Sequence, residues 1–294
     1  MESEVTILIV DDSRENIDIL LSLLDDYDLL VALNGPRALE LTTKNDIDLI
    51  LLDIVMPGMD GYEVCRCLKD QVQTRDIPIL FITSRTDEGS LETAFASGAS
   101  DYVTKPFRPR ELRARVKTQI KLYRSLKKLE FAATRDALTG ILNRREFFNR
   151  GQKMTTAAAG TLYAVMIDID RFKRINDSYG HACGDQAIRL VTQRISDFLP
   201  ADTIFGRLGG EEFAILIEND TPNAIQEQTE QIRSAIEKES FTCQEHQISI
   251  SVSMGITIHQ PGENLDSLLL RADQELYRAK GSGRNRICFR EGRD

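Results

Sequence analysis

Short apolar runs alternate with amphipathic segments over the first 107 residues of the chain. The strand-like runs occupy residues 6–10, 29–33, 48–53, 78–83 and 101–107. Between them, apolar positions recur at a spacing of three and four, as on one face of a helix, at 14–24, 37–43, 62–69 and 88–96. This alternation predicts an α/β fold, a doubly wound five-stranded parallel sheet with helices on both faces.

One long helix is predicted after this region. Residues 111–136 contain no Gly or Pro. Apolar residues recur every three or four positions, at Leu112, Val116, Ile120, Tyr123, Leu126 and Leu129 or Ala133. We expect the first part to complete a domain over 4–124. The stripe over 125–134 is too narrow for a core of its own and predicts a coiled-coil stalk. The alternative is a monomeric helix that packs on its own domain.

A different pattern runs from residue 135 to residue 294. Strands are expected at 163–170, 247–259 and 286–289, a hairpin at 203–218, and helices at 186–198, 221–239 and 265–280. Strands and helices mixed with a hairpin predict an α+β domain in which helices cover the sheet.

Composition is that of a folded protein, with 41% hydrophobic and 28% charged residues. There is no basic and apolar leader, and no apolar run approaches the ~20 residues of a membrane helix, so we expect a cytoplasmic protein with no membrane partner. The five cysteines are scattered, and Cys65 and Cys67 are expected on different sides of a helix. Neither a zinc site nor a disulfide framework is therefore expected.

The net charge of −9 is unevenly distributed, because residues 108–130 hold nine basic side chains and two acidic ones. A basic stripe can contact nucleic acid. The solvated face of a helix is the commoner origin of such a stripe. We therefore expect no nucleic-acid partner.

Polar residues mark the ends of four strands in the first region. Asp11 and Asp12 follow the first strand, and Asp53, Thr83 and Lys105 end the third, fourth and fifth. The carboxyl ends of parallel strands share one sheet edge, so these groups are expected to lie together. Any one Asp is equally a turn former. Three carboxylates together repel one another unless a hard cation such as Mg²⁺ lies among them.

The segment RLGGEEFAIL (207–216) places two glycines and two glutamates between apolar runs. A hairpin turn explains the glycines. A carboxylate held against a metal-bound phosphate explains the glutamates as well. If the strand that ends at Asp168 is its neighbour, Asp168 and Glu211 share a pocket that suits Mg²⁺ and phosphoryl or nucleotidyl transfer. The GxxxxGK[ST] pattern is absent, which excludes an ordinary P-loop.

The first region resembles a response-regulator receiver domain. The resemblance rests on VDDS (10–13), LLDIVMPGMDGYEV (51–64), ITS (82–84) and DYVTKPF (101–107), and covers about residues 4–124. It implies that Asp53 accepts a phosphoryl group from a histidine kinase or a phosphotransfer protein. The Mg²⁺ ligands it implies are Asp11, Asp12, Asp53 and the carbonyl of Val55. Thr83 and Lys105 are implied to contact the phosphoryl group, with Tyr102 as an aromatic switch and Lys105–Pro106 as a cis bond.

The second region resembles a GGDEF-type diguanylate cyclase domain, a nucleotidyl-cyclase-like fold. The motifs are DALTGILNRR (136–145), DIDRFKRINDSYGHACGD (168–185), GGEEF (209–213) and KGSGRN (280–285). The resemblance implies that two GTP condense into cyclic di-GMP and pyrophosphate across a homodimer, since each site holds one GTP. The implied Mg²⁺ ligands are Asp168, the carbonyl of Ile169 and Glu211; the implied catalytic acids are Glu211 and Glu212. The implied substrate contacts are Asn176 and Asp185 with guanine, His181 near the substrate, and Lys173, Lys280 and Arg284 with the triphosphate.

One departure from that family affects product binding. Many members carry an Arg-x-x-Asp site before the glycines, and the corresponding residues here are 200–203, Pro-Ala-Asp-Thr. We therefore expect product inhibition through this site to be absent or weak.

Two other functions were weighed against phosphorylation-activated cyclic di-GMP synthesis. A response regulator that only binds a nucleotide or cyclic di-GMP is disfavoured because Asp168 and Glu211 are retained. A DNA-binding response regulator is disfavoured because the second domain is acidic and no helix-turn-helix is apparent. The hypothesis for activation is that phosphorylation of Asp53 repacks the last helix of the receiver and moves the stalks.

Overall fold

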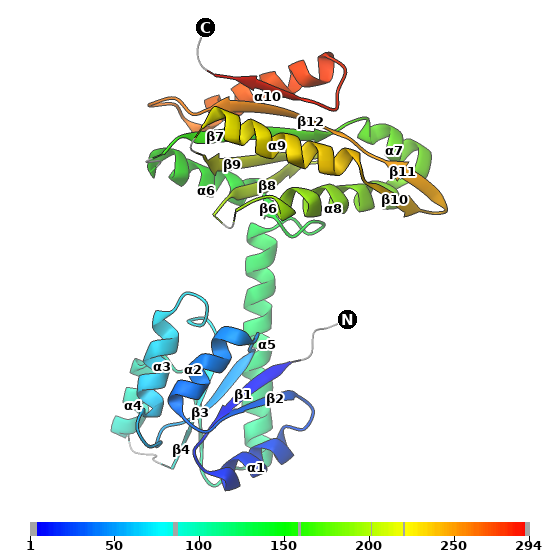
Figure 1. The fold of residues 1–294 in the computed structure, drawn as a ribbon. Helices are drawn as coiled ribbons and strands as arrows, with labels where there is room; N and C mark the ends of the chain where they lie inside the picture. The colour runs from blue at the N-terminus through cyan, green and yellow to red at the C-terminus, as the bar shows by residue number, and fades with distance from the viewer. Residues whose placement is uncertain (1–4, 85–87, 158–159, 201, 220, 292–294) are drawn as a thin grey trace. The chain divides into compact units, whose positions relative to one another are not determined.

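A computed structural model describes residues 5–84, 88–157, 160–200, 202–219 and 221–291. The chain forms two compact units divided between Leu129 and Glu130 (Figure 1). The division falls inside α5 (Pro109–Thr134), an unbroken helix of 26 residues. The long helix predicted after the first region is therefore present. Within the described ranges, no helix is long and apolar enough to cross a membrane.

The first unit is built on a parallel five-stranded sheet of order β2-β1-β3-β4-β5. Its strands are β1 (Thr6–Val10), β2 (Asp28–Ala32), β3 (Leu49–Asp53), β4 (Ile79–Thr83) and β5 (Asp101–Thr104). The helices between them are α1 (Arg14–Leu23), α2 (Gly35–Lys44), α3 (Gly61–Asp70) and α4 (Glu88–Ala96). The α/β prediction is confirmed, strand by strand.

Alternate residues of each strand enter two separate cores. Ile7 and Ile9 of β1 pack with α1 and α5 on one face of the sheet. Leu8 and Val10 pack with α2 and α3 on the other face. Strands buried on both faces read as continuous apolar runs, which is why the five runs were visible in the sequence.

Helix α5 changes character along its length. Leu112, Val116 and Ile120 are buried in the core of the first unit. Beyond Tyr123 the apolar residues are exposed, with Leu126 at 55% and Leu129 at 66%. The predicted stripe therefore continues past the point where its own unit covers it.

The second unit contains a mixed six-stranded sheet of order β13-β12-β7-β9-β8-β6. Its strands are β6 (Leu142–Asn143), β7 (Leu162–Ile169), β8 (Ile204–Gly209), β9 (Glu212–Glu218), β12 (Val252–Ile258) and β13 (Ile287–Arg290). A separate antiparallel pair is formed by β10 (Ser240–Cys243) and β11 (His246–Ser249). The helices are α6 (Arg144–Ala157), α7 (Phe172–Tyr179), α8 (His181–Asp197), α9 (Pro222–Glu237) and α10 (Leu265–Gly281).

Strand β7 is the centre of this sheet, and all eight of its residues are buried. Tyr163, Val165 and Ile167 face the core formed with α8 and α9. Ala164 and Met166 face the core formed with α6 and α10. Helices therefore cover both faces, as predicted for an α+β domain (Figure 1).

Three details differ from the predicted elements. The strand expected over 247–259 is two strands, β11 and β12, because the chain changes partner from β10 to β7. The hairpin β10–β11 was missed because Gln244 and Glu245 make its turn with positive φ angles of 49° and 68°, without a glycine. The segment 171–185 contains the separate helix α7, which ends at Gly180 with φ 82°.

The expectation of no disulfide was wrong. Cys183 and Cys243 are joined, with their Cα atoms 5.9 Å apart across a sequence separation of 60 residues. Both lie in the core where α8 packs beside β10. Such a pairing depends on tertiary contact, so the spacing of cysteines along the sequence did not indicate it.

Candidate functional site

Three carboxylates gather at the carboxyl edge of the first sheet. Oxygens of Asp11, Asp12 and Asp53 lie within 4.8 Å of one another. Asp11 and Asp53 are 0% and 5% exposed, while Asp12 is exposed. Lys105 places its Nζ atom 3.0 Å from Oδ2 of both Asp11 and Asp53. Four of the five residues predicted to share this edge therefore lie together, and the fifth, Thr83, ends the neighbouring strand β4.

The position of Asp11 is fixed by neighbouring donors. Its Oδ1 accepts the backbone N–H of Ser13 at 2.8 Å, and both its oxygens are 3.0 Å from the amide nitrogen of Asn16. Ser13 also caps α1. Together with Asp12 and Asp53, Asp11 offers a donor set of hard oxygens that suits Mg²⁺.

Burial raises the pKa of Asp53, and the negative charge of Asp11 adds to the effect, while Lys105 opposes it. Burial alone lowers the pKa of Lys105, but hydrogen bonds to Asp53 and Asp11 outweigh burial and raise it. Lys105 therefore stays charged beside the acids.

The predicted switch residues lie near this cluster. Thr83 ends β4 and is 3% exposed. Tyr102 on β5 is half-buried, packs edge-on against Phe95 at 6.2 Å, and lies 5.7 Å below the guanidinium carbon of Arg115. The Lys105–Pro106 bond is cis, as the receiver resemblance implied. Val55, the implied carbonyl ligand, is 59% exposed.

A second acidic cluster lies where the end of β7 runs beside the start of β9. Asp168 is paired in register with Glu212, and the backbone N–H of Ile169 donates to the carbonyl of Glu211 at 3.4 Å. Strands far apart in sequence thus bring the predicted acids together. Glu211 is half-buried and Glu212 is exposed.

Lys280 of α10 is the cation of this second cluster. Its Nζ lies 2.7 Å from Oδ2 of Asp168. Burial raises the pKa of Asp168 to about 6, Lys280 opposes the shift, and Glu211 and Glu212 add to it. Asp168 and Glu211, with a main-chain carbonyl, offer hard oxygen donors of the kind that Mg²⁺ prefers.

The turn between β8 and β9 is held from a distant motif. Gly210 adopts φ 50°, which a residue with a side chain rarely does. Arg207 donates through Nε to the carbonyl of Gly210 at 2.9 Å and pairs with Oδ1 of Asp136 at 3.0 Å. The Asp136 carboxylate also accepts the hydroxyl and the backbone N–H of Thr139. The DALTG and GGEEF motifs are therefore one bonded structure.

The same motif is tied to the end of α5. The Nδ2 atom of Asn143 donates to the carbonyl of Ala133 at 3.0 Å, and an Nη atom of Arg145 donates to the same carbonyl at 2.5 Å. Hydrogen bonds thus connect the last turn of α5 with the segment that supports the GGEEF turn.

The implied guanine contacts lie on α7 and α8. Asn176 is half-buried, and a side chain at Gly184 would collide with its Oδ1 atom. Asp185 follows Gly184 in α8, so Asn176 and Asp185 lie on two helices that pack against each other. His181 and Lys173 are exposed at the same end of the domain. Arg284 is exposed in the turn after α10, with φ 66°.

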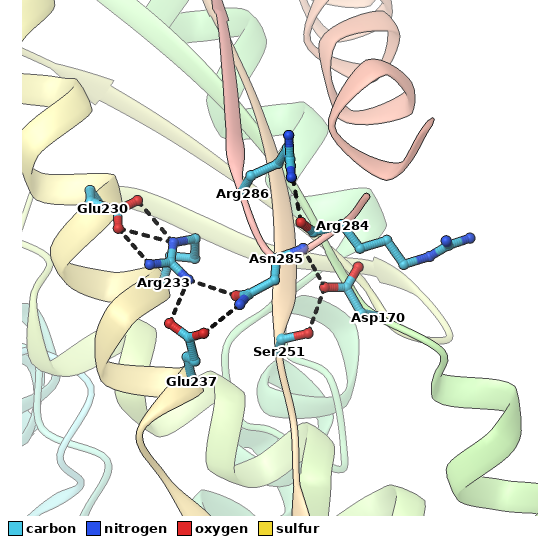
Figure 2. Close-up of polar contacts among 8 residues, drawn as sticks. All are labelled: Asp170, Glu230, Arg233, Glu237, Ser251, Arg284, Asn285 and Arg286. Carbon is cyan, nitrogen blue, oxygen red and sulfur yellow. Dashed lines mark hydrogen bonds and ion pairs between the residues drawn. The ribbon is translucent and has the colours of Figure 1, made fainter. Parts of the chain in front are cut away.

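Sequence reasoning missed Asp170, Arg233 and Asn285, which are joined by hydrogen bonds through Asn285 (Figure 2). Asp170 and Asn285 are 115 residues apart in sequence. The sequence signal that could have indicated Asp170 is the DID motif (168–170), in which a second Asp follows the predicted metal ligand Asp168.

Comparison with known families agrees with this geometry. Residues 133–286 match the family described as "Diguanylate cyclase, GGDEF domain", and residues 7–117 match the response regulator receiver domain. The chain belongs to the GGDEF diguanylate cyclase family. Its GGDEF domain follows a receiver domain, in the order inferred from the motifs.

Curated relatives and solved structures show the same likeness. The response regulator PleD of Caulobacter vibrioides is 31% identical over 96% of this chain, which spans 65% of PleD. The diguanylate cyclase DgcM of Escherichia coli is 38% identical over 54% of this chain and 39% of its own length. The coiled coil and GGDEF domain of DgcB from Caulobacter crescentus, solved with c-di-GMP, superposes with a TM-score of 0.57 at 29% identity, covering 62% of this chain and 98% of that one.

Proposed function

We propose that this protein is a diguanylate cyclase activated by phosphorylation of its receiver domain. Two GTP condense into cyclic di-GMP and pyrophosphate, with one GTP held by each of two facing cyclase domains. The observation that carries the proposal is the in-register pairing of Asp168, near the end of β7, with Glu212 at the start of β9, next to Glu211 and beside Lys280. The family match supports the same activity.

Asp168, the carbonyl of Ile169 and Glu211 are the residues that would hold Mg²⁺ in the cyclase domain. When bound, the ion neutralises negative charge on the phosphate oxygens. Glu211 and Glu212 are the acids placed to accept the proton of the attacking ribose 3′-hydroxyl. That oxygen forms a bond to the α-phosphorus of the other GTP while the bond to pyrophosphate breaks.

The other residues of the domain orient the substrate. Asn176 and Asp185 contact the guanine edge, where the Asp185 carboxylate accepts hydrogen bonds from the N1–H and N2–H₂ donors that adenine lacks. Lys173, Lys280 and Arg284 pair with the triphosphate, with Lys280 exchanging its contact with Asp168 for a phosphate oxygen. His181 lies near the substrate.

In the receiver, Asp53 attacks the phosphorus of a phosphohistidine on a histidine kinase or phosphotransfer protein. Asp11, Asp12, Asp53 and the carbonyl of Val55 would hold Mg²⁺ there. Thr83 and Lys105 contact the phosphoryl oxygens, and Tyr102 turns inward with Thr83. The resulting change reaches α5 and brings two cyclase domains together, a local charge change acting on a two-state element.

Chromatography of products formed from GTP and Mg²⁺ tests the activity. The wild-type chain is expected to form cyclic di-GMP, and E211Q to form at least a hundredfold less because it loses a ligand and a base. E218Q, an exposed glutamate at the far end of β9, is the matched control. GTP binding without product by the wild type would favour a nucleotide-binding regulator, and salt-sensitive DNA binding would favour a transcription factor.

A further inference from the structure

Asp170 is a buried carboxylate whose two oxygens are both engaged by protein donors. It is 7% exposed. Its Oδ1 accepts the hydroxyl of Ser253 at 2.7 Å. Its Oδ2 accepts the hydroxyl of Ser251 at 2.7 Å and the backbone N–H of Asn285 at 2.9 Å (Figure 2). Asp168, two residues earlier, pairs instead with Lys280. The two acids of DID therefore have different partners, and Asp170 is hydrogen-bonded to the turn after α10.

That turn has an unfavourable backbone. Arg284 and Asn285 have φ angles of 66° and 48°, in the left-handed region that side chains disfavour. Consecutive residues of this kind persist only where surrounding contacts hold them. The Arg284 N–H donates to the carbonyl of Ala279 at 3.0 Å, and Asp170 holds the next N–H.

Helix α9 holds the same turn from the opposite side. Oδ1 of Asn285 accepts a hydrogen bond from Arg233 at 2.6 Å, and its Nδ2 donates to Oε1 of Glu237 at 2.6 Å (Figure 2). The Arg233 side chain is only 12% exposed and also pairs with Glu230 and Glu237. The side chain and the N–H of Asn285 are thus fixed by different elements.

The result of this support is the placement of Arg284. Its exposed side chain lines a cavity of about 510 Å³ together with Arg171, Arg174 and Asp170. Within the described ranges the Arg284 guanidinium has no carboxylate partner, because the nearby Asp170 is occupied by three donors. It remains available to an anionic ligand.

We propose that Asp170 is a positioning residue that fixes Arg284 for the phosphate chain of the nucleotide, with the Arg233–Asn285 contact as its counterpart on α9. The inference rests on the proposed function for the identity of that nucleotide. Asp170 touches no substrate; it acts through the backbone of the turn.

Calorimetric binding of the α,β-methylene analogue of GTP, with Mg²⁺, tests the proposal against binding of GMP. D170A is expected to weaken binding of the triphosphate analogue about 10- to 100-fold, as the loss of a charge-assisted contact would. The affinity for GMP is expected to change less than threefold. D170N can still accept from Asn285 and Ser251 and donate to Ser253, so it is expected within threefold of the wild type. D273A, an exposed aspartate of α10, is the matched control.

A double-variant cycle separates positioning from general destabilisation. In the R284A background, D170A is expected to reduce the affinity for the analogue less than twofold further. Both substitutions remove the same interaction, the contact of Arg284 with the phosphate chain. Equal losses for GMP and the triphosphate analogue, or additive losses in the cycle, would overturn the proposal. If D170A does not fold, R233M is expected to give the same selective loss, and unchanged affinity of R233M would overturn it.

The binding readout keeps the two proposals distinguishable. A wild-type chain that binds the analogue but makes no cyclic di-GMP contradicts the proposed activity and leaves the positioning test intact. A wild-type chain that fails to bind the analogue contradicts both.

Discussion

Each acidic cluster joins buried carboxylates to one lysine. Lys105 lies 3.0 Å from Asp53, and Lys280 lies 2.7 Å from Asp168. Burial raises the pKa of both carboxyl groups, and the lysine opposes the shift in each case. The lysine therefore favours the ionised form of a buried acid, which is costly without a partner.

The residues over 200–203 predict weak product inhibition. Position 201 lies outside the described residues, whereas Pro200 and Thr203 border a cavity of about 260 Å³. Neither supplies a charged group for cyclic di-GMP. In initial-rate assays, added cyclic di-GMP is expected to leave the wild-type rate within twofold, and the P200R/T203D variant is expected to gain inhibition. Strong inhibition of the wild type, with product bound at these residues, would contradict this.

Glu263 predicts a pH-dependent contribution to stability. Its carboxylate accepts from Arg271 at 2.6 and 2.8 Å and from the backbone N–H of Gln260 at 3.0 Å. Burial raises its pKa, but these donors outweigh burial and lower the pKa below the ordinary 4.5. The stabilisation is therefore present above pH 4.5 and is lost as the pH falls through the lowered value.

Denaturant unfolding of E263Q across pH checks this contribution. At pH 7 the variant is expected to lose about 1–3 kcal/mol of unfolding free energy. The difference from the wild type is expected to shrink as the pH falls below 4.5. A difference that does not vary between pH 7 and pH 3 would exclude the Arg271 pairing as its source.

At the scale of elements, turn geometry decides what the sequence could reveal. The β8–β9 turn was predictable because two glycines mark it, and the caps Ser13, Asn34 and Asp60 stand at helix starts. The β10–β11 hairpin and the break between α7 and α8 were not predicted from the sequence. The role of Asn285 was not predicted either, because its left-handed backbone depends on partners that are distant in sequence.

The Cys183–Cys243 disulfide predicts redox-dependent stability of the second unit. A link closing about 60 residues stabilises by roughly 4 kcal/mol through the unfolded chain. Reductant is therefore expected to lower the unfolding free energy of the oxidised protein by an amount of this order. The C183S/C243S variant is the control and should not respond to reductant. An equal response in both would assign the effect to Cys65, Cys67 or Cys288.

The exposed stripe on α5 predicts association. Leu126 and Leu129 are large apolar side chains open to solvent, as expected of a stalk that pairs with a second copy. L126E/L129E is expected to shift the protein toward monomer in sedimentation and to lower cyclase activity at least tenfold, without changing the unfolding transition. The matched control is K128E, at an exposed polar position. Full activity in a monomeric L126E/L129E protein would contradict the dimer requirement.

At the scale of the whole molecule, the fold was predictable because motifs mark the ends of strands. Asp53 and Asp168 end buried apolar runs, so the topology gathers them with their partners. The supporting contacts were not predictable, because Arg207 reaches Asp136 and Asp170 reaches Asn285 only in the folded chain. The first contact joins the DALTG motif to the GGEEF turn, and the second joins the end of β7 to the turn after α10.

The most direct test of the central claim is cyclic di-GMP formation from GTP and Mg²⁺, with and without beryllofluoride as a phosphoryl mimic, in the wild type and in D53N. Product is expected mainly with the mimic in the wild type, and the mimic is expected to have no effect on D53N. Equal product with and without the mimic would support the cyclase activity and contradict its activation by phosphorylation. Normal activation of D53N, or no product in any sample, would contradict the regulated cyclase.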